Sequence, residues 1–136
     1  MDIFYSKYKS LPGTSYREIK HCVDVSFTKI KRRTRRRPYL RSAYFHGEKI
    51  FFEYFWAHLR QKNYKDQIRR LKFFRASLEL LQYSCHIAET SINRHNTTDK
   101  LYRFQGKTAD SRLFIVQVKE NKKTGQKFFM SCFPRE

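Results

Sequence analysis

The fold is decided near the C-terminus, where residues 101–133 read LYRFQGKTADSRLFIVQVKENKKTGQKFFMSCF. Apolar and polar residues alternate in three segments of this stretch, which are 101–107, 113–120 and 127–133. A period of two residues places successive side chains on opposite faces, so we expect three β-strands. Residues 109–111 and 121–125 would form the turns, and Gly125 suits the left-handed conformation that closes the second one. The pattern predicts an antiparallel sheet of three or four strands.

The register of this sheet follows from keeping apolar residues on one face. The two turns predict these opposed pairs: Tyr102–Val118 and Phe104–Val116 in the first hairpin, and Val118–Phe128, Val116–Met130 and Phe114–Cys132 in the second. The apolar face would pack on helices. The opposite face would be a mixture of cations, amides, a hydroxyl and aromatic rings, formed by Arg103, Gln105, Ile115, Gln117, Lys119, Lys127, Phe129, Ser131 and Phe133.

This polar face predicts a site for a phosphodiester. In the expected register Arg103, Gln117 and Phe129 lie abreast, and Ser131 lies diagonal to Gln117. Lys119 would oppose Lys127, which is unfavourable unless an anion lies between the two ammonium groups. Phe129 or Phe133 could stack on an unpaired base. The alternative is that the loop of residues 84–99 covers this face, so that both phenylalanines belong to the core.

An amphipathic helix is expected ahead of the sheet. Apolar residues recur at steps of three and four, at Ile19, Val23, Phe27 and Ile30, which is typical of a helix. Ser15 precedes the helix as its N-cap, and Glu18 stands at the capping-box position. The helix would begin at Tyr16 and end in the basic residues before Pro38.

Two further helices complete the expected α+β fold, at Glu48–Lys62, which is apolar nearly all round, and at Lys65–Tyr83. Residues 1–15, 38–47 and 84–99 would be irregular. We expect about three N-terminal helices followed by a three- to four-stranded antiparallel sheet. All 136 residues would form a single domain, 1–136, with a basic helical part at 1–64 and a helix plus sheet at 65–136.

The charge of the chain predicts a polyanionic partner. Thirty Lys and Arg stand against 12 Asp and Glu, a net charge of +18. Residues 1–75 hold 20 basic and 6 acidic residues, a balance of 20 − 6 = +14, so the excess lies in the N-terminal half. Self-repulsion destabilises a compact basic domain, and a phosphate backbone offsets it. We therefore expect nucleic acid, with RNA favoured, as the partner.

Basic residues in two helices are the candidate nucleic-acid contacts. Six cations occur within Lys31–Arg37, and three more flank the apolar stripe of the third helix. With the lysine of the last strand, the candidates are Lys31, Arg32, Arg33, Arg35, Arg36, Arg37, Arg69, Arg70, Lys72 and Lys127. A solvated helix end, a localisation tract or surface ion pairs of small value are the alternative interpretations.

Several other classes of protein and site are disfavoured. No apolar segment is long enough to span a membrane, and no signal-peptide or lipidation pattern is present, so we expect a cytoplasmic protein with no membrane partner. Cys22, Cys85 and Cys132 are isolated, without a CxxC pair. Phosphate-binding loops, HExxH and paired carboxylate clusters are also missing, so no metal or cofactor is expected.

Histidine is the usual acid or base in RNA cleavage, because its pKa lies near neutrality. His58 follows the apolar run of the second expected helix, where a structural role is the simpler interpretation. His86 and His95 flank the strands and could reach the polar face. None of them is paired in sequence with a carboxylate, so the general base stays unassigned.

The strand segments Leu101–Thr108, Phe114–Glu120 and Lys127–Pro134 resemble the barnase–EndoU–colicin–RelE superfamily. Its members are small metal-independent ribonucleases, frequently toxins of phages or mobile elements. The resemblance covers about residues 65–136, and residues 1–64 match nothing in the superfamily. It implies a phosphate site lined by Arg103, Gln117, Lys119 and Ser131, which are the candidate catalytic residues. A histidine common in several branches has no clear counterpart here.

Three hypotheses follow for the function. In the first, the protein is a small endoribonuclease that cleaves by attack of the 2′-hydroxyl, with Lys119 and Arg103 stabilising the phosphorane. The second is a non-catalytic nucleic-acid-binding protein, an accessory or regulatory factor of a mobile element. The third is a basic protein whose main partner is an acidic protein, such as an antitoxin.

Overall fold

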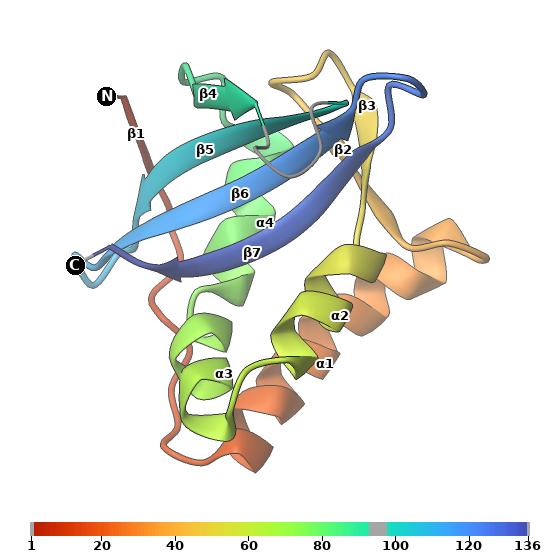
Figure 1. Cartoon of the computed structure of the whole chain (residues 1–136). Helices are drawn as coiled ribbons and strands as arrows, with labels where there is room; N and C mark the ends of the chain where they lie inside the picture. The colour runs from red at the N-terminus through yellow and green to blue at the C-terminus, as the bar shows by residue number, and fades with distance from the viewer. Residues whose placement is uncertain (1, 93–97, 136) are drawn as a thin grey trace.

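A computed structural model describes residues 2–92 and 98–135 of the chain. Within these residues it contains four helices, namely α1 (Tyr16–Thr34), α2 (Glu53–Arg60), α3 (Tyr64–Leu71) and α4 (Phe74–Tyr83). It also contains seven strands, namely β1 (Ile3–Tyr5), β2 (Tyr39–Ser42), β3 (Glu48–Phe51), β4 (Glu89–Ile92), β5 (Asp99–Lys107), β6 (Leu113–Asn121) and β7 (Lys127–Pro134). The strands form one curled sheet. Helix α4 lies behind β5 and β6, and α1, α2 and α3 gather below β7 (Figure 1).

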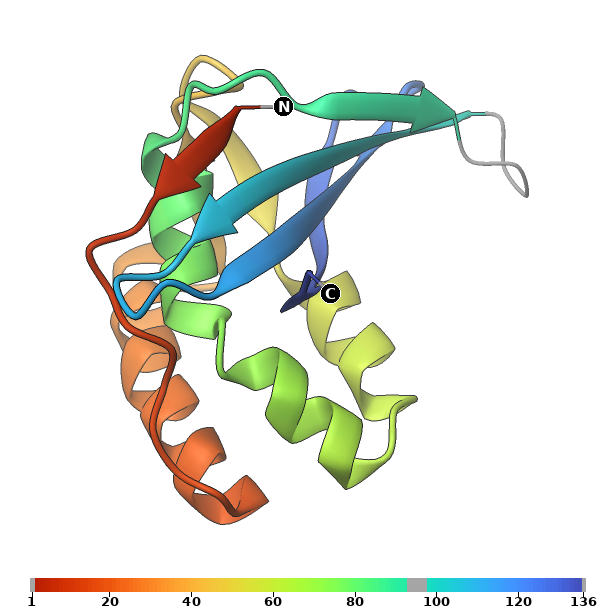
Figure 2. The same ribbon diagram turned by 90° about the vertical axis from the view of Figure 1, so that its left-hand side faces the viewer.

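The α+β class is confirmed, whereas the predicted order of elements and the purely antiparallel sheet are wrong. The strand order is β1-β5-β6-β7-β3-β2, with β4 also paired to β5. Strand β1 pairs in parallel with β5, and β3 pairs in parallel with β7, so the sheet is mixed. Strands from the first 64 residues thus flank the C-terminal strands on both sides, as Figures 1 and 2 show for β1 and Figure 1 for β3. At three or four residues each, β1, β2 and β3 are too short to show a period of two.

Helix α1 matches its prediction closely. The Ser15 hydroxyl accepts a hydrogen bond from the Glu18 backbone N–H at 3.2 Å, which confirms the N-cap. Ile19, Val23 and Ile30 are buried, as the period of the sequence requires. The helix ends at Thr34, because Arg35 adopts a positive φ of 58°.

The segment predicted as one helix from Glu48 to Lys62 divides into strand β3 and helix α2. Ile50 pairs with Lys127 and Phe51 with Phe128, so the first four residues add a strand beside β7. Phe52 is 1% exposed and joins the two elements. A short apolar run is compatible with a buried strand and with a buried helix, so the period of the sequence does not distinguish the two elements here.

The helix predicted at Lys65–Tyr83 is interrupted at Lys72 and Phe73, where α3 ends and α4 begins. The Lys72 carbonyl accepts a hydrogen bond from the Leu11 backbone N–H at 2.8 Å. This hydrogen bond connects the N-terminal segment to the break between α3 and α4. Because its two residues are far apart in the sequence, the local pattern around Lys72 does not predict the break. The expected loop at 84–99 contains strand β4 and the first residue of β5, and its residues 93–97, with His95, lie outside the described residues.

The register of the β5–β6 hairpin is confirmed, and that of the β6–β7 hairpin is wrong. Tyr102 opposes Val118 and Phe104 opposes Val116, as expected. In the second hairpin the observed partners are Val118–Phe129, Val116–Cys132 and Phe114–Pro134. The turn is one residue longer than predicted, since Asn121 donates its N–H to the Gln126 carbonyl. The pairing then shifts by one more residue at Gln117/Val118, which leaves Met130 as a β-bulge.

The longer turn exchanges the faces of Phe128 and Phe129 relative to the predicted register, and the bulge at Met130 returns Ser131 and Cys132 to their predicted faces. Phe129 turns into the core, where its ring stacks on Phe55 at 4.4 Å and meets Phe52 edge-on at 5.8 Å. Its expected place on the polar face is therefore wrong. Phe128 turns to that face instead and contacts the Tyr54 ring at 4.6 Å.

We predict that Gly106→Ala destabilises the fold by about 1–3 kcal/mol, because overpacking a filled core forces its neighbours to move. Gly106 opposes Phe114, and a Cβ at this position would lie 2.3 Å from the Phe114 ring. Urea unfolding of the single variants and of the Gly106→Ala/Phe114→Leu double variant measures the coupling between the two sites. Gly106→Ala should lower the free energy of unfolding less when Phe114 is replaced by Leu than when Phe114 is present. A Gly106→Ala protein as stable as the wild type would contradict this pairing.

Candidate nucleic-acid interface

Three of the predicted site residues form a row across the sheet on its outer face. Arg103 opposes Gln117, and Gln117 opposes Ser131. Because a guanidinium only donates, the Gln117 amide is assigned with its oxygen toward Arg103. That oxygen accepts hydrogen bonds from Arg103 Nε at 2.8 Å and Nη2 at 2.9 Å, and the amide nitrogen donates to Ser131 Oγ at 3.1 Å. We name Arg103, Gln117 and Ser131 the polar row.

Two further side chains, those of Arg70 and His58, lie beside the polar row. The guanidinium carbons of Arg70 and Arg103 lie 5.4 and 5.9 Å from the centre of the Phe133 ring. His58 of α2 and Arg70 of α3 line the same small pocket as Ser131. The row therefore joins cations and a titratable base that come from separate parts of the chain.

His58 is held as a neutral imidazole. Partial burial lowers its pKa below 6.5, and the positive charges of Lys62 and Arg70 lower the pKa further. A hydrogen bond to the Met130 backbone acts in the opposite direction. Sequence reasoning treated His58 as structural, and only the fold shows that the bulge residue fixes its ring next to Ser131.

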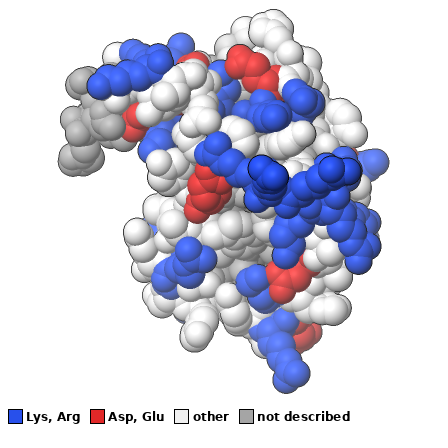
Figure 3. All heavy atoms as spheres, turned by 90° about the vertical axis from the view of Figure 1, so that its right-hand side faces the viewer, with Lys and Arg blue, Asp and Glu red and all other residues white. Residues whose placement is uncertain are grey.

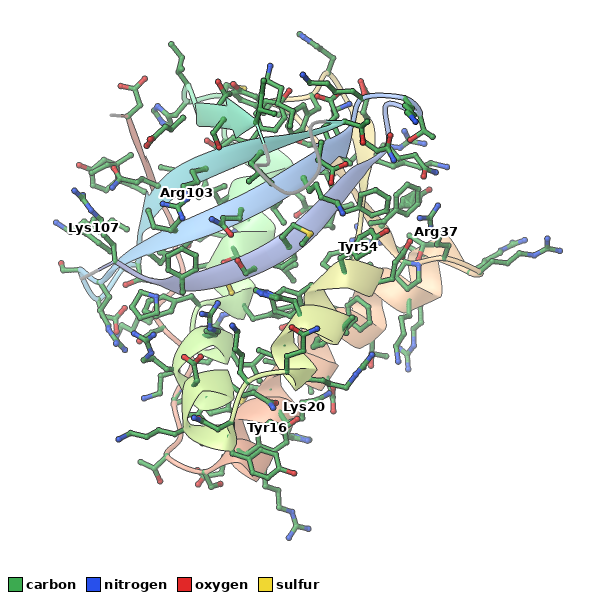
Figure 4. The ribbon with its side chains drawn as sticks, in the orientation of Figure 1. Tyr16, Lys20, Arg37, Tyr54, Arg103 and Lys107 are labelled. Carbon is green, nitrogen blue, oxygen red and sulfur yellow. The ribbon has the colours of Figure 1, made fainter. Side chains whose placement is uncertain are left out.

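The polar row is closed to a substrate in this conformation. Ser131 is 3% exposed, and the pocket that it shares with His58 and Arg70 has no space for a water molecule. Arg103 is the exposed member of the row and lies on the front face of the sheet in Figure 4. Its guanidinium can contact a phosphate, whereas Gln117 and Ser131 act by orienting it.

The predicted opposition of Lys119 and Lys127 is wrong, because the longer β6–β7 turn pairs Lys119 with Phe128 and Lys127 with Glu120. Each lysine lies beside a carboxylate. Lys119 Nζ lies 3.7 Å from an Asp99 carboxylate oxygen and 4.2 Å from the centre of the Tyr54 ring. Lys127 is 5% exposed and forms ion pairs with Glu48 at 2.7 Å and Glu120 at 3.3 Å. Lys127 thus links β7 to β3 and β6, and its burial removes it from the candidate phosphate contacts.

A strip of aromatic rings crosses the same face next to the polar row, and sequence reasoning missed it. Strand pairing aligns Tyr39 with Phe51 and Phe51 with Phe128, and Tyr54 of α2 packs on Phe128. We name Tyr39, Phe51, Phe128 and Tyr54 the aromatic strip. The segments that carry these four rings were predicted as a connection, a single helix and a strand, so no sequence signal placed them together.

Cations are stacked on the aromatic strip. The Arg37 guanidinium carbon lies 3.6 Å from the centre of the Phe51 ring, and Arg37 Nε donates to a Glu53 carboxylate oxygen at 2.7 Å. Lys49 Nζ lies 4.5 Å from the Tyr39 ring centre. Figure 4 shows Arg37 and Tyr54 together at the edge where α2 meets the sheet. Such contacts hold positive charge against the rings of the strip. Phe128 itself is buried, at 5% exposed.

The strip continues into the basic run at the end of α1, which we name the basic end, formed by Lys31, Arg32, Arg33, Arg35, Arg36 and Arg37. All six residues are exposed. Within the described part of the chain, the side chains of Arg32, Arg33, Arg35 and Arg36 have no ion-pair partner. Basic side chains crowd the face of the molecule that contains this region (Figure 3).

The remaining candidate cations are less available. Arg69 and Arg70 both lie 3.3 Å from the Asp66 carboxylate, one helical turn earlier in α3. Lys72 is half-buried at the break between α3 and α4. These three residues lie apart from the basic end along the chain, and Asp66 offsets part of their charge.

Other side chains proposed from the sequence lie outside the polar row. His86 is exposed, 4.0 Å from Asp2 near the N-terminus. Cys22, Cys85 and Cys132 are free thiols, and burial raises the pKa of Cys132 to about 12. Among the described residues no group of His, Cys, Asp and Glu side chains is placed to hold a metal ion. None of the described helices is long and apolar enough to cross a membrane.

Comparisons of the chain with protein-family models, curated proteins and solved structures found no match.

We predict that His58 titrates below pH 6.5 and that Arg70→Gln raises its pKa, because the variant removes a nearby positive charge. A folded-state pKa below the unfolded value means that the unfolded chain binds the proton more tightly. Stability should thus fall as the pH drops from 6.5 through the folded-state pKa. NMR titration of the His58 imidazole measures its pKa in the wild type and in the Arg70→Gln variant. Lys123→Gln, in the exposed β6–β7 turn, is the control and should leave the pKa unchanged. A pKa above 6.5 would contradict the described environment.

Proposed function

We propose that this protein binds nucleic acid, with RNA favoured, through the basic end and the aromatic strip. The observation that carries the proposal is the continuity of the two surfaces. Arg37 is the last residue of the basic end, and its guanidinium stacks on Phe51 in the middle of the aromatic strip. A row of exposed cations, of which Arg37 also pairs with Glu53, thus leads directly to a row of rings.

The two surfaces suit the two chemical parts of a nucleic acid strand. Exposed guanidinium groups contact phosphate oxygens, and each neutralised phosphate releases counterions. Tyr54 is 41% exposed and Tyr39 is partly exposed, so both rings have area free for stacking on an unpaired base. Stacking requires bases outside a duplex, which favours single-stranded segments of RNA.

We predict that Arg35→Gln/Arg36→Gln weakens binding to a single-stranded RNA about tenfold or more at physiological salt, because it removes two phosphate contacts. Fluorescence anisotropy with a labelled oligonucleotide measures the dissociation constant.

The matched control is Arg17→Gln/Lys65→Gln, which removes the same net charge. Both residues are exposed, and they lie near the opposite end of α1, where Tyr16 packs on Tyr64 at 4.9 Å. The control should lose much less affinity. Equal losses in the two double variants would show that net charge, and not the basic end, determines binding.

A second candidate function is metal-independent RNA cleavage at the polar row. The observation in its favour is that His58, neutral near pH 7, shares a pocket with Arg70 and Ser131. His58 would accept the proton of the 2′-hydroxyl as that oxygen attacks phosphorus, and Arg103 and Lys119 would stabilise the phosphorane. The P–O5′ bond would then break, leaving a 2′,3′-cyclic phosphate and a 5′-hydroxyl that takes its proton from water. The resemblance of the strands to the ribonuclease superfamily agrees with this chemistry. A toxin-like role in a phage or mobile element rests on that resemblance alone.

We predict that, if this candidate is right, the protein fragments RNA in the presence of EDTA and that His58→Gln and Arg103→Gln each abolish the fragments. Denaturing gels of total RNA give the readout, and Arg17→Gln should cleave as the wild type does. Intact RNA at protein concentrations that saturate binding would reject cleavage and leave a non-catalytic binding protein. The closure of the polar row favours this non-catalytic outcome.

A further inference from the structure

A groove separate from the nucleic-acid interface lies between α1 and α4. It has a volume of about 590 Å³. Lys7, Tyr8, Leu11 and Pro12 of the N-terminal segment and Leu40 of β2 contribute to its walls. Figure 2 shows how the N-terminal segment leaves β1 and descends past α4 to the start of α1. The described residues of the basic end and the aromatic strip take no part in it except Arg33.

The floor of the groove is apolar. It is formed by Leu11, Ile30, Leu40 and Leu78, each 9% exposed or less. Val25 also lines the groove and is 51% exposed. Val25 therefore adds exposed apolar surface beside the floor.

The charge around this floor is positive. Lys7, Lys29, Arg33 and Arg75 line the groove, against one carboxylate among its described lining residues, that of Glu79, a balance of 4 − 1 = +3. The carboxylate is already engaged, since it accepts the Lys7 backbone N–H at 3.0 Å. Arg75 stacks on Tyr8 at 4.8 Å, and its buried Nε has no acceptor among the described residues. Arg75 Nη2 donates to the Lys9 carbonyl at 3.4 Å, which holds the guanidinium at the wall of the groove.

We propose that the groove binds an acidic amphipathic helix of a protein partner. The α1 residues that line it run from His21 to Arg33, about 18 Å at 1.5 Å per residue, which matches three turns of a docked helix. Apolar side chains at i, i+3 or i+4 and i+7 would occupy the floor, and flanking carboxylates would meet the four cations.

Two other occupants fit these observations less well. The groove is open to solvent along one side, whereas small-molecule sites enclose most of the ligand surface. Nucleic acids prefer polar interfaces, which the floor of Leu11, Ile30, Leu40 and Leu78 does not provide. A helix buries one face and leaves the other in water, as an open groove requires.

A labelled synthetic peptide of roughly 14 residues tests the proposal, with Leu at i, i+3, i+7 and i+10 and Glu at most other positions. Fluorescence anisotropy should show saturable binding in the micromolar range. Val25→Glu should weaken it roughly tenfold or more, because the new carboxylate faces those of the peptide. Ile87→Glu is the matched control, since Ile87 is 74% exposed and does not line the groove, and its affinity should stay close to that of the wild type.

Four results would overturn the proposal. The first is that peptide binding does not saturate at about 100 µM protein, and the second is that the Val25→Glu protein binds the peptide as tightly as the wild type. The third is that Val25→Glu and Ile87→Glu lose the same affinity. The fourth is that a scrambled peptide of the same composition binds as tightly as the designed one. Binding of sodium dodecanoate that Val25→Glu abolishes, without peptide binding, would assign the groove to a small anionic amphiphile instead. Thermal unfolding of both variants verifies that each is folded, as expected for changes at exposed positions.

Discussion

The extra residue Met130 in β7 is the constraint on which the outer face of the sheet depends. On one side of the bulge Val118 faces Phe129, and on the other Gln117 faces Ser131. The register set by the turn directs Phe129 into the aromatic core, and the bulge then aligns Ser131 with Gln117 and Arg103. The backbone of Met130 also holds the ring of His58. Without this single insertion the Ser131 side chain would lie on the opposite face of the sheet, away from Gln117 and Arg103.

The arrangement of carboxylates explains where the charge of +18 is concentrated. Glu48 and Glu120 neutralise the buried Lys127, Asp99 approaches Lys119, and Asp66 pairs with both arginines of α3. Acidic residues thus support the sheet and the short helices. The basic end has few such partners, so the repulsion between its guanidinium groups is relieved best by an external polyanion.

Local signals in the sequence predicted the parts of the fold that local interactions determine. The N-cap at Ser15, the period of α1, the β5–β6 register and the positive φ of Gly125 were all predicted correctly. The parallel strands β1 and β3 were missed, because their partners lie far away in the sequence. For the site, the sequence predicted which residues take part better than how they are arranged. Arg103 and Gln117 do lie abreast, as expected. The bulge that aligns Ser131 with them leaves no recognisable pattern in the alternation of β7.

The salt dependence of RNA affinity tests most directly the claim that the basic end and aromatic strip bind a phosphate backbone. The dissociation constant of the full-length chain for a single-stranded oligonucleotide would be measured between about 50 and 300 mM salt. A logarithmic plot should be linear and steep, with a slope whose size falls by roughly one unit for each cation of the basic end that is replaced. An affinity that does not change over this range would contradict the account, because it would remove phosphate contact as the source of binding.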